Sequence, residues 1–320
     1  RSHRYRWVEP LSMEYKGYTL HELPPAGQGV AALQMLKMLE GHDLQAMGHN
    51  SVHYLHTLIE AKKLAYADIA RYIADPDHMD VRPESLLDVG YLARRAQLID
   101  PAAAANHPDA GRLATASETI YLTVADQYGN MISFINSLYG HFGSGVVVPG
   151  TGLVLQNRGA GFTMEHGHPN QIAPNKRPFH TIIPAFVTKD GRPWLSFGVM
   201  GGDMQPQGHT QVLVNIIDFG MNLQEAGDAA RLMHDGGRQP TDALAGSAAD
   251  TVDIDNLGVL MVEPGIPIAT VEALRAMGHN VEVETTGIPF GGYQAIARDA
   301  ESGVYVGATE MRKDGQASGY

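Results

Sequence analysis

Cysteine is absent from the 320 residues of this chain. The absence excludes disulfide bonds, zinc–thiolate sites, iron–sulfur clusters and a cysteine nucleophile. It does not determine the compartment, because cysteine-free proteins occur in both the cytoplasm and the periplasm. We expect a soluble protein and leave the localisation open between these two compartments.

Positive charge is scarce, with 23 Lys and Arg residues against 35 Asp and Glu residues and a formal net charge of −12. An acidic surface repels a phosphate backbone, so no nucleic-acid partner is expected. No stretch approaches the ~18 consecutive apolar residues of a membrane-spanning helix, so no membrane partner is expected. With 44% hydrophobic and 18% charged residues, the composition indicates a globular protein with a large core.

The first hundred residues have a mainly helical pattern. Apolar residues at helical spacing predict helices over residues 27–39, 50–74 and 83–98. From Asp100 to Ser117 the chain consists of proline, alanine, glycine and small polar residues without periodicity. This stretch is predicted to be an exposed linker.

From Thr119 onward the pattern changes to strand. Residues 119–125 and 131–135 are rich in β-branched and aromatic residues around a glycine-containing loop, which predicts a hairpin. Further strands are predicted at 182–188, 194–198, 281–285, 293–298 and 304–309, and further helices at 207–219, 223–232 and 268–277. Blocks of helices and strands in this order predict an α+β fold with sheets between helical layers.

Thr119 is the candidate nucleophile, because it starts a strand directly after the predicted linker. A cut between Glu118 and Thr119 gives the threonine a free α-amine beside its own hydroxyl. The amine can remove the hydroxyl proton, and the oxygen can then attack an amide carbonyl. An unperturbed α-amine has a pKa of ~7.7–8.0, which suits a general base near neutral pH. A threonine that simply begins a strand is the plainer interpretation.

Short blocks of sequence extend this hypothesis to nearly the whole chain. The blocks are Glu9–Ser12, Pro24–Pro25, Ala65–Asp68, Thr119–Asn130, Phe142–Gly145, Lys176–Pro178, Gly201–Gly202 and Ser318–Tyr320. In order and spacing they resemble the γ-glutamyltranspeptidase family of N-terminal nucleophile hydrolases. No single block is specific, but the combination is.

The resemblance implies a four-layer αββα sandwich and a precursor that cuts itself into two subunits. Residues 1–118 then correspond to the C-terminal part of the large subunit, mostly helical and ending in the linker. Residues 119–320 correspond to the small subunit, with the nucleophile at its N-terminus, and the two parts form one composite domain. The family's large subunit is longer, and we expect its N-terminal portion, with an arginine that binds a substrate carboxylate, to lie outside this sequence.

Gly201 and Gly202 are the candidate oxyanion hole. A developing oxyanion needs backbone N–H donors that can approach closely, and glycine has no side chain to obstruct them. The family uses the equivalent pair for this purpose, although a Gly-Gly turn between a strand and a helix is also an ordinary structural feature. The resemblance further assigns Ser137 to a second hydroxyl that hydrogen-bonds and orients the nucleophile.

The predicted substrate-binding residues depart from the family's γ-glutamyl enzymes. The segment 156–162 lacks both acids of the family motif, whose last acidic residue binds the substrate α-amine, and contains Arg158 instead. A Ser-Ser pair that binds the α-carboxylate is replaced by His180 and Thr181, and an Asn that contacts the same carboxylate is replaced by Tyr139. The arginine fork suits a carboxylate. The alternative to carboxylate binding is that the Arg158 side chain points into solvent and covers a strand edge.

Three of the 15 histidines, His49, His53 and His56, share a helical stripe. Two His at i, i+4 can bind Zn²⁺, but no acidic residue is expected to accompany them, and packing on a neighbouring element is the preferred interpretation. We expect no metal and no cofactor.

The sequence therefore predicts an autoprocessed amidohydrolase, resembling the acylase-like and oxamate-hydrolysing branches. It would cleave a small amide that carries a carboxylate, such as an oxamate-like or glutaryl-like acyl group, through a threonine acyl-enzyme. Two alternatives stay open: a true γ-glutamyltranspeptidase or glutathione hydrolase with an altered pocket, and an inactive, unprocessed homologue that acts as a binding protein. The expected partners are the small-molecule amide and the two subunits of one precursor, and a dimer of such heterodimers is compatible with the sequence.

Overall fold

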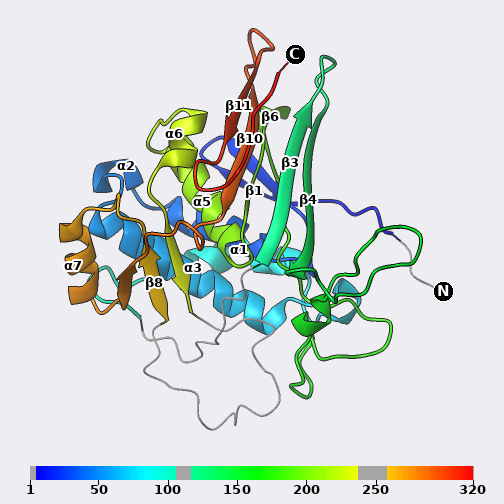
Figure 1. Cartoon of the computed structure of the whole chain (residues 1–320). Helices are drawn as coiled ribbons and strands as arrows, with labels where there is room; N and C mark the ends of the chain where they lie inside the picture. Colours follow the sequence, from blue (N-terminus) through cyan, green and yellow to red (C-terminus); the bar gives the residue numbers. More distant parts are fainter. Residues whose placement is uncertain (1–4, 106–116, 237–257, 320) are drawn as a thin grey trace.

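A six-stranded antiparallel sheet lies at the centre of the computed structural model, which describes residues 5–105, 117–236 and 258–319 (Figure 1). In spatial order its strands are β1 (Leu11–Tyr15), β2 (Tyr18–Glu22), β5 (Ala185–Lys189), β6 (Arg192–Met200), β10 (Gly292–Arg298) and β11 (Tyr305–Thr309). Strand β2 pairs with β5, with Leu20 opposite Val187. Strands from both sides of the Glu118–Thr119 bond therefore share one sheet.

The hairpin β1–β2 was not expected, because the first hundred residues have a mainly helical pattern. Leu11, Met13 and Tyr15 are buried and the residues between them are exposed, as in a strand with one face on the core. Lys16 and Gly17 both have positive φ, of 49° and 84°, which is the backbone of a tight two-residue hairpin turn. Five residues per strand give too few alternations to stand out beside the long helices that follow.

Helices cover one face of this sheet. They are α1 (Gly29–Leu39), α3 (Val52–Tyr72) and α5 (Met204–Ile217), with the shorter α2 (Leu44–Met47), α4 (Val89–Ala96), α6 (Leu223–Asp228) and α7 (Ile268–Ala276) around them. Gly208 of α5 lies against Val199, and the His209 ring is 5.0 Å from that of Phe197. The odd-numbered residues of β6 thus face the helices.

A separate hairpin, β3 (Ser117–Ala125) and β4 (Met131–Gly140), packs on the opposite face of the sheet. The Thr123 hydroxyl donates to Ser196 Oγ at 2.8 Å, and the Tyr121 ring covers Gly198. The even-numbered residues of β6 thus face the hairpin, as strand alternation requires. Helices, sheet and hairpin are three layers of an α+β fold.

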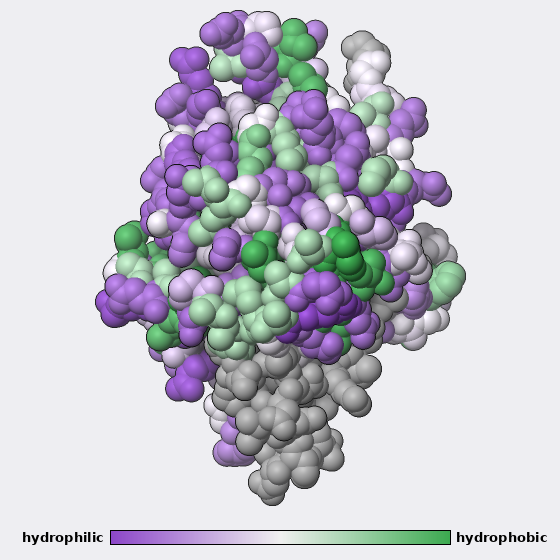
Figure 2. Space-filling model, turned by 90° about the vertical axis from the view of Figure 1, so that its left-hand side faces the viewer, coloured by the Kyte–Doolittle hydropathy of each residue, from purple (hydrophilic) through white to green (hydrophobic). Residues whose placement is uncertain are grey.

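The outer face of the β3–β4 hairpin is apolar and exposed. It carries Ile120, Leu122, Val124, Ile132 and Phe134, each between 42% and 72% exposed. In contrast, Figure 2 shows hydrophilic residues interspersed with apolar ones on the face that carries α2 and α7. Among residues 5–105, 117–236 and 258–319 no helix covers the hairpin, so the fourth layer of the expected αββα sandwich stays a proposal.

Several predicted elements have different bounds. The predicted helix over 83–98 is divided into a 3₁₀ turn, η2 (Pro83–Leu87), and α4, because Asp88 caps a new helix by accepting from the Tyr91 N–H at 2.7 Å. The predicted helix over 223–232 ends at Asp228, and a small sheet of β7 (Leu232–Asp235), β8 (Val259–Val262) and β9 (Val281–Val283) follows. Most of the predicted linker, residues 106–116, lies outside the described residues.

Across the described ranges, every helix is too short or too polar to span a bilayer.

Candidate active site

Thr119 lies on the inner face of β3, in line with Tyr121 and Thr123. It is 3% exposed and pairs across the hairpin with Ser137 of β4. The Thr119 hydroxyl donates to Ser137 Oγ at 3.2 Å, and the N–H of Tyr139 donates to the same oxygen at 2.9 Å. The predicted nucleophile and its predicted hydroxyl partner are therefore brought together.

A β-bulge interrupts the hairpin beside the predicted cleavage site. Ser117 pairs with Gly140 and Thr119 with Ser137, so β4 advances three residues while β3 advances two. The extra residue of β4 lies in the bulge beside Tyr139. The φ of Tyr139 is 77°, which is unusual for a residue other than glycine. Bulges bend a strand and redirect side chains, and they are frequent next to active sites. Here the bulge takes the backbone around Glu118 out of regular pairing.

The contacts between β3 and β6 follow β6 toward the glycine pair at its end. Thr123 contacts Ser196 and Tyr121 contacts Gly198, so each two-residue step along β3 matches a two-residue step along β6. If this match continued for one further step, Thr119 would lie at Met200, the last residue of β6 and the neighbour of Gly201.

Gly201 and Gly202 form the loop between β6 and α5, as the sequence predicted. Their φ angles are 133° and 58°, which L side chains rarely adopt, and a Cβ atom on Gly201 would lie 3.0 Å from Gly291 Cα. The carbonyl of Gly202 accepts the N–H of Gln205 at 3.2 Å at the start of α5. Glycine is therefore required for the conformation of this loop, and the oxyanion role of its N–H groups stays a prediction.

Arg158 is a buried cation with no acidic partner among residues 5–105, 117–236 and 258–319. It lies in the 3₁₀ turn η3 (Arg158–Gly161) and is 7% exposed. Its Nη1 donates to Thr181 Oγ1 at 3.4 Å, and its Cζ is 5.3 Å from the centre of the Tyr139 ring. Its Nη2 has no hydrogen-bond partner in the described part of the chain, and burial lowers the pKa of the guanidinium. This arrangement excludes the alternative in which Arg158 points into solvent at a strand edge.

His180 lies next to this arginine and is uncharged at neutral pH. Burial lowers the pKa of its imidazole to about 4, and the positive charges of Arg158 and Arg177 lower it further in the same direction. Its Nδ1 is buried and hydrogen-bonds to none of the residues that the structure describes, and its backbone N–H donates to the Ala26 carbonyl at 3.1 Å. Arg158, Tyr139, His180 and Thr181, predicted as one substrate-binding group, therefore lie together.

Gln28 is a residue of this region that the sequence analysis missed. Its side chain is fully buried and donates to the Thr181 carbonyl and to the Gly202 carbonyl, both at 2.8 Å. It thereby links the arginine group to the glycine loop. The available signal was its position directly before α1, where Ser, Thr, Asp or Asn is usual, because those residues cap a helix.

The three histidines of the predicted stripe separate into different environments. His53 is exposed, and the ring of His49 packs edge-on against Phe219 at 5.0 Å. His56 is buried, and contrary to expectation an acid accompanies it on the same helix, because Glu60 lies one turn further along.

His56, Glu60 and His279 have ligand atoms within 4.8 Å of one another, as in a metal site. However, the Lys63 ammonium donates to Glu60 at 2.7 Å, and His56 and His279 hydrogen-bond directly at 2.8 Å. A divalent cation would have to share this buried space with the lysine charge, which is unfavourable. The lysine thus already supplies the cation that neutralises Glu60.

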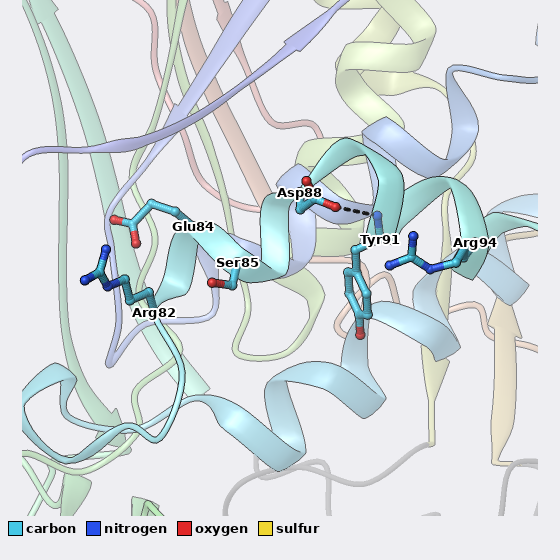
Figure 3. Close-up of a pocket in the computed structure, with 6 residues that line it drawn as sticks. All are labelled: Arg82, Glu84, Ser85, Asp88, Tyr91 and Arg94. Carbon is cyan, nitrogen blue, oxygen red and sulfur yellow. Dashed lines mark hydrogen bonds between the residues drawn. The ribbon is translucent and has the colours of Figure 1, made fainter.

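A concave surface on η2 and α4 lies apart from these residues (Figure 3). It is lined by Arg82, Glu84, Ser85, Asp88, Tyr91 and Arg94. Two of these side chains have structural partners: Asp88 caps α4, and the Tyr91 hydroxyl donates to Asp68 at 2.8 Å. No residue of the predicted site lines this surface, and we assign it no function.

The chain is similar to known proteins over its whole length. The family model described as Gamma-glutamyltranspeptidase matches residues 1–320. The chain is 36% identical over 321 residues to the glutathione hydrolase-like YwrD proenzyme of Bacillus subtilis (strain 168). It is 35% identical over 327 residues to the oxamate amidohydrolase proenzyme of Klebsiella pneumoniae subsp. pneumoniae. Each alignment covers 100% of this chain and 57% of the relative, so the chain spans little more than half the length of these relatives.

A solved structure is similar over the same extent. The crystal structure of cephalosporin acylase from Bacillus halodurans superposes with a TM-score of 0.85 and 41% sequence identity, covering 100% of this chain and 55% of the acylase chain.

Proposed function

This chain belongs to the gamma-glutamyltranspeptidase family, and we propose that it forms part of an amidohydrolase that processes itself at the Glu118–Thr119 bond. Residues 1–118 would be the end of the large subunit and residues 119–320 the small subunit. The apolar outer face of the β3–β4 hairpin would be covered by the upstream part of the large subunit, completing the four-layer αββα sandwich.

The proposed reaction proceeds through an acyl-enzyme on Thr119. The α-amine that cleavage releases takes the proton of Oγ1, and the oxygen attacks the amide carbonyl of the substrate. The N–H groups of Gly201 and Gly202 bind the oxyanion of the tetrahedral intermediate. The C–N bond then breaks, the leaving amine takes the proton, and water hydrolyses the ester. Ser137 orients the nucleophile through the hydrogen bond between the two hydroxyls.

The buried Arg158 is the observation that carries the proposed substrate class. An uncompensated buried charge costs roughly 3–5 kcal/mol, and the described residues provide no carboxylate for this one. A substrate carboxylate would supply the missing charge and accept hydrogen bonds from Nη2 and from Thr181. An α-ammonium would instead be repelled by the guanidinium. We therefore propose a small amide with a free carboxylate and without an α-ammonium.

Mass spectrometry of the purified full-length protein tests self-processing. The wild type should give two chains that separate at Glu118–Thr119, and Thr119→Ala should give one folded, uncut chain. A wild type that stays uncut would support the inactive binding protein, and a Thr119→Ala protein cut at the same bond would show that another protease is responsible.

A matched pair of anilides tests the substrate class, because glutaryl and γ-glutamyl anilides differ only by the α-ammonium. We expect faster cleavage of the glutaryl compound. Arg158→Gln should raise its KM roughly 10- to 100-fold, the effect of losing a hydrogen-bonded charge, whereas Arg192→Gln at an exposed position should leave KM unchanged. Preferential cleavage of the γ-glutamyl anilide would contradict the proposal and favour a true transpeptidase.

A further inference from the structure

Gln28 holds the two halves of the proposed site in a fixed relation. We infer that this glutamine is a positioning residue that sets the distance between the carboxylate-binding group and the oxyanion loop, and so selects the length of the acyl chain that is cleaved. The inference rests on the proposed function and deepens it, because it concerns which carboxylate-bearing amides fit.

The side chain of Gln28 is committed to this link. Gln28 stands at the N-cap position of α1, yet its side chain makes no capping hydrogen bond. Both hydrogens of Nε2 go to carbonyls that are 153 and 174 residues away, those of Thr181 and Gly202. Turning the amide over would place its oxygen against two carbonyl oxygens, so the hydrogen bonds determine the orientation of the group.

The two carbonyls that accept from Gln28 belong to the two binding functions of the proposed site. The Gly202 carbonyl is part of the loop whose N–H groups are the candidate oxyanion donors, and with φ of 58° this glycine has no side chain to restrict its backbone. The hydrogen bond from Gln28 supplies that restriction. The Thr181 carbonyl is on the residue whose hydroxyl accepts from Arg158. Gln28 thus holds the backbone beneath both binding functions.

The neighbours of Gln28 in the sequence contact the same segment, residues 180–181. The Ala26 carbonyl accepts the N–H of His180, and residues Gly27 and His180 form a β-bridge. A Cβ atom on Gly27 would lie 2.8 Å from His180 Cε1, so only glycine allows this approach. Residues 26–28 therefore lie along residues 180–181, hydrogen-bond to them, and connect this segment to Gly202.

A substrate that places its carboxylate at Arg158 and its scissile carbonyl at the glycine loop must match the distance between them. A rigid link makes one chain length fit and the others misalign, and misplacement by about 1 Å can cost on the order of 10² in rate. Loss of the link should reduce turnover of the preferred substrate more than it weakens binding, because Arg158 itself is retained.

Gln34 provides a matched control for the experiment. It lies on the same helix, is also fully buried, and also donates two hydrogen bonds through Nε2, to Asp68 Oδ2 at 3.0 Å and to the Leu86 carbonyl at 2.9 Å. Neither partner belongs to the proposed site. Gln28→Met and Gln34→Met therefore remove similar interactions, and only the first touches the link.

The two variants are prepared in the full-length protein, checked for completed self-cleavage, and assayed with malonyl, succinyl, glutaryl and adipyl anilides. Gln28→Met should lower kcat for the preferred anilide roughly 10- to 100-fold with a smaller change in KM, and should flatten the preference among chain lengths. Gln34→Met should keep both kcat and the preference. Equal behaviour of the two variants would overturn the inference, whereas a wild type inactive on all four anilides would instead refute the proposed function.

Gln28→Glu gives a second test, which also applies if Gln28→Met remains uncut. An ionised carboxylate would face the Thr181 and Gly202 carbonyl oxygens, and only the protonated acid could donate to one of them. The ratio of variant to wild-type kcat should therefore rise as the pH falls. A ratio independent of pH would overturn the inference, because a purely structural defect has no reason to follow this ionisation.

Discussion

At the scale of single residues, His180 links the charge of the proposed substrate to pH. The unliganded protein keeps this imidazole neutral, because burial and two nearby arginines lower its pKa from 6.5 to about 4. Since the unfolded state binds the proton first, this residue contributes stability above pH 6.5 that is lost as the pH falls toward 4. A carboxylate bound at Arg158 would offset the positive charges and raise the pKa of His180 again.

We therefore predict that dicarboxylates bind with uptake of a proton. Because the anion favours the imidazolium, lowering the pH from 7 to about 5 should tighten the binding of glutarate. Isothermal titration calorimetry in two buffers of different ionisation enthalpy measures the proton uptake directly. His180→Asn should abolish the uptake while it keeps Arg158, and an uptake that persists in this variant would assign the proton to another group.

The sequence could identify the residues of the site that belong to family blocks, but not the residue that joins them. Thr119, Ser137 and Arg158 could be selected as candidates because each falls within or near a recognisable block, and their roles stay predictions. Gln28 could not, since its role depends on two backbone carbonyls that are more than 150 residues away. Nothing in the local pattern around a buried glutamine indicates which distant backbone it contacts.

At the scale of elements, the contact between β3 and β6 depends on the absence of one side chain. A Cβ atom at Gly198 would lie 2.5 Å from Tyr121 Cδ2, within a buried and closely packed ring. We predict that Gly198→Ala destabilises the protein by about 1–3 kcal/mol, the usual cost of overpacking, and slows self-cleavage, because it displaces the strand that carries Thr119. Gly41→Ala is the control, since nothing lies within 4 Å of its added methyl group.

Denaturant unfolding and the rate of precursor cleavage measure these two effects. Wild-type stability and cleavage in Gly198→Ala would show that the hairpin does not depend on this packing.

The helices and strands that a local sequence pattern determines were predicted. The elements that depend on hydrogen bonds to residues distant in the sequence were not. The β3–β4 hairpin follows from the alternation of its residues. The start of α3 follows from the Ser51 cap, whose hydroxyl accepts the Tyr54 N–H at 3.2 Å. Strand β7 was not predicted, and the helix predicted over 223–232 ran into its first residue, Leu232, because the backbone partners of this strand are distant in the sequence. The side chains of Gln207 and Gln211 each exchange two hydrogen bonds with its backbone, at His234 and Leu232 respectively. Two side-chain amides one helical turn apart on α5 thus make the hydrogen bonds that the backbone of a neighbouring strand would otherwise make.

At the scale of the whole molecule, the α+β class followed from the order of helical and strand blocks. The spatial order of the sheet could not be predicted, because β1 and β2 were not recognised and pairing between β2 and β5 spans more than 160 residues. The family resemblance implied that the two proposed subunits form one composite domain. The described residues show a sheet with strands from both of them.

If the chain is cut as proposed, this shared sheet changes the order of the folding reaction. Before the Glu118–Thr119 bond is cut, β2 and β5 are tethered and their pairing is a unimolecular event. After the cut, the same ladder joins two separate molecules, so reassembly from the unfolded state becomes bimolecular and depends on protein concentration. The proposed mature enzyme would then owe its persistence to slow unfolding rather than to a favourable refolding equilibrium. Self-cleavage would thus turn a protein that can refold as a single chain into a complex of two chains that does not readily reassemble after unfolding.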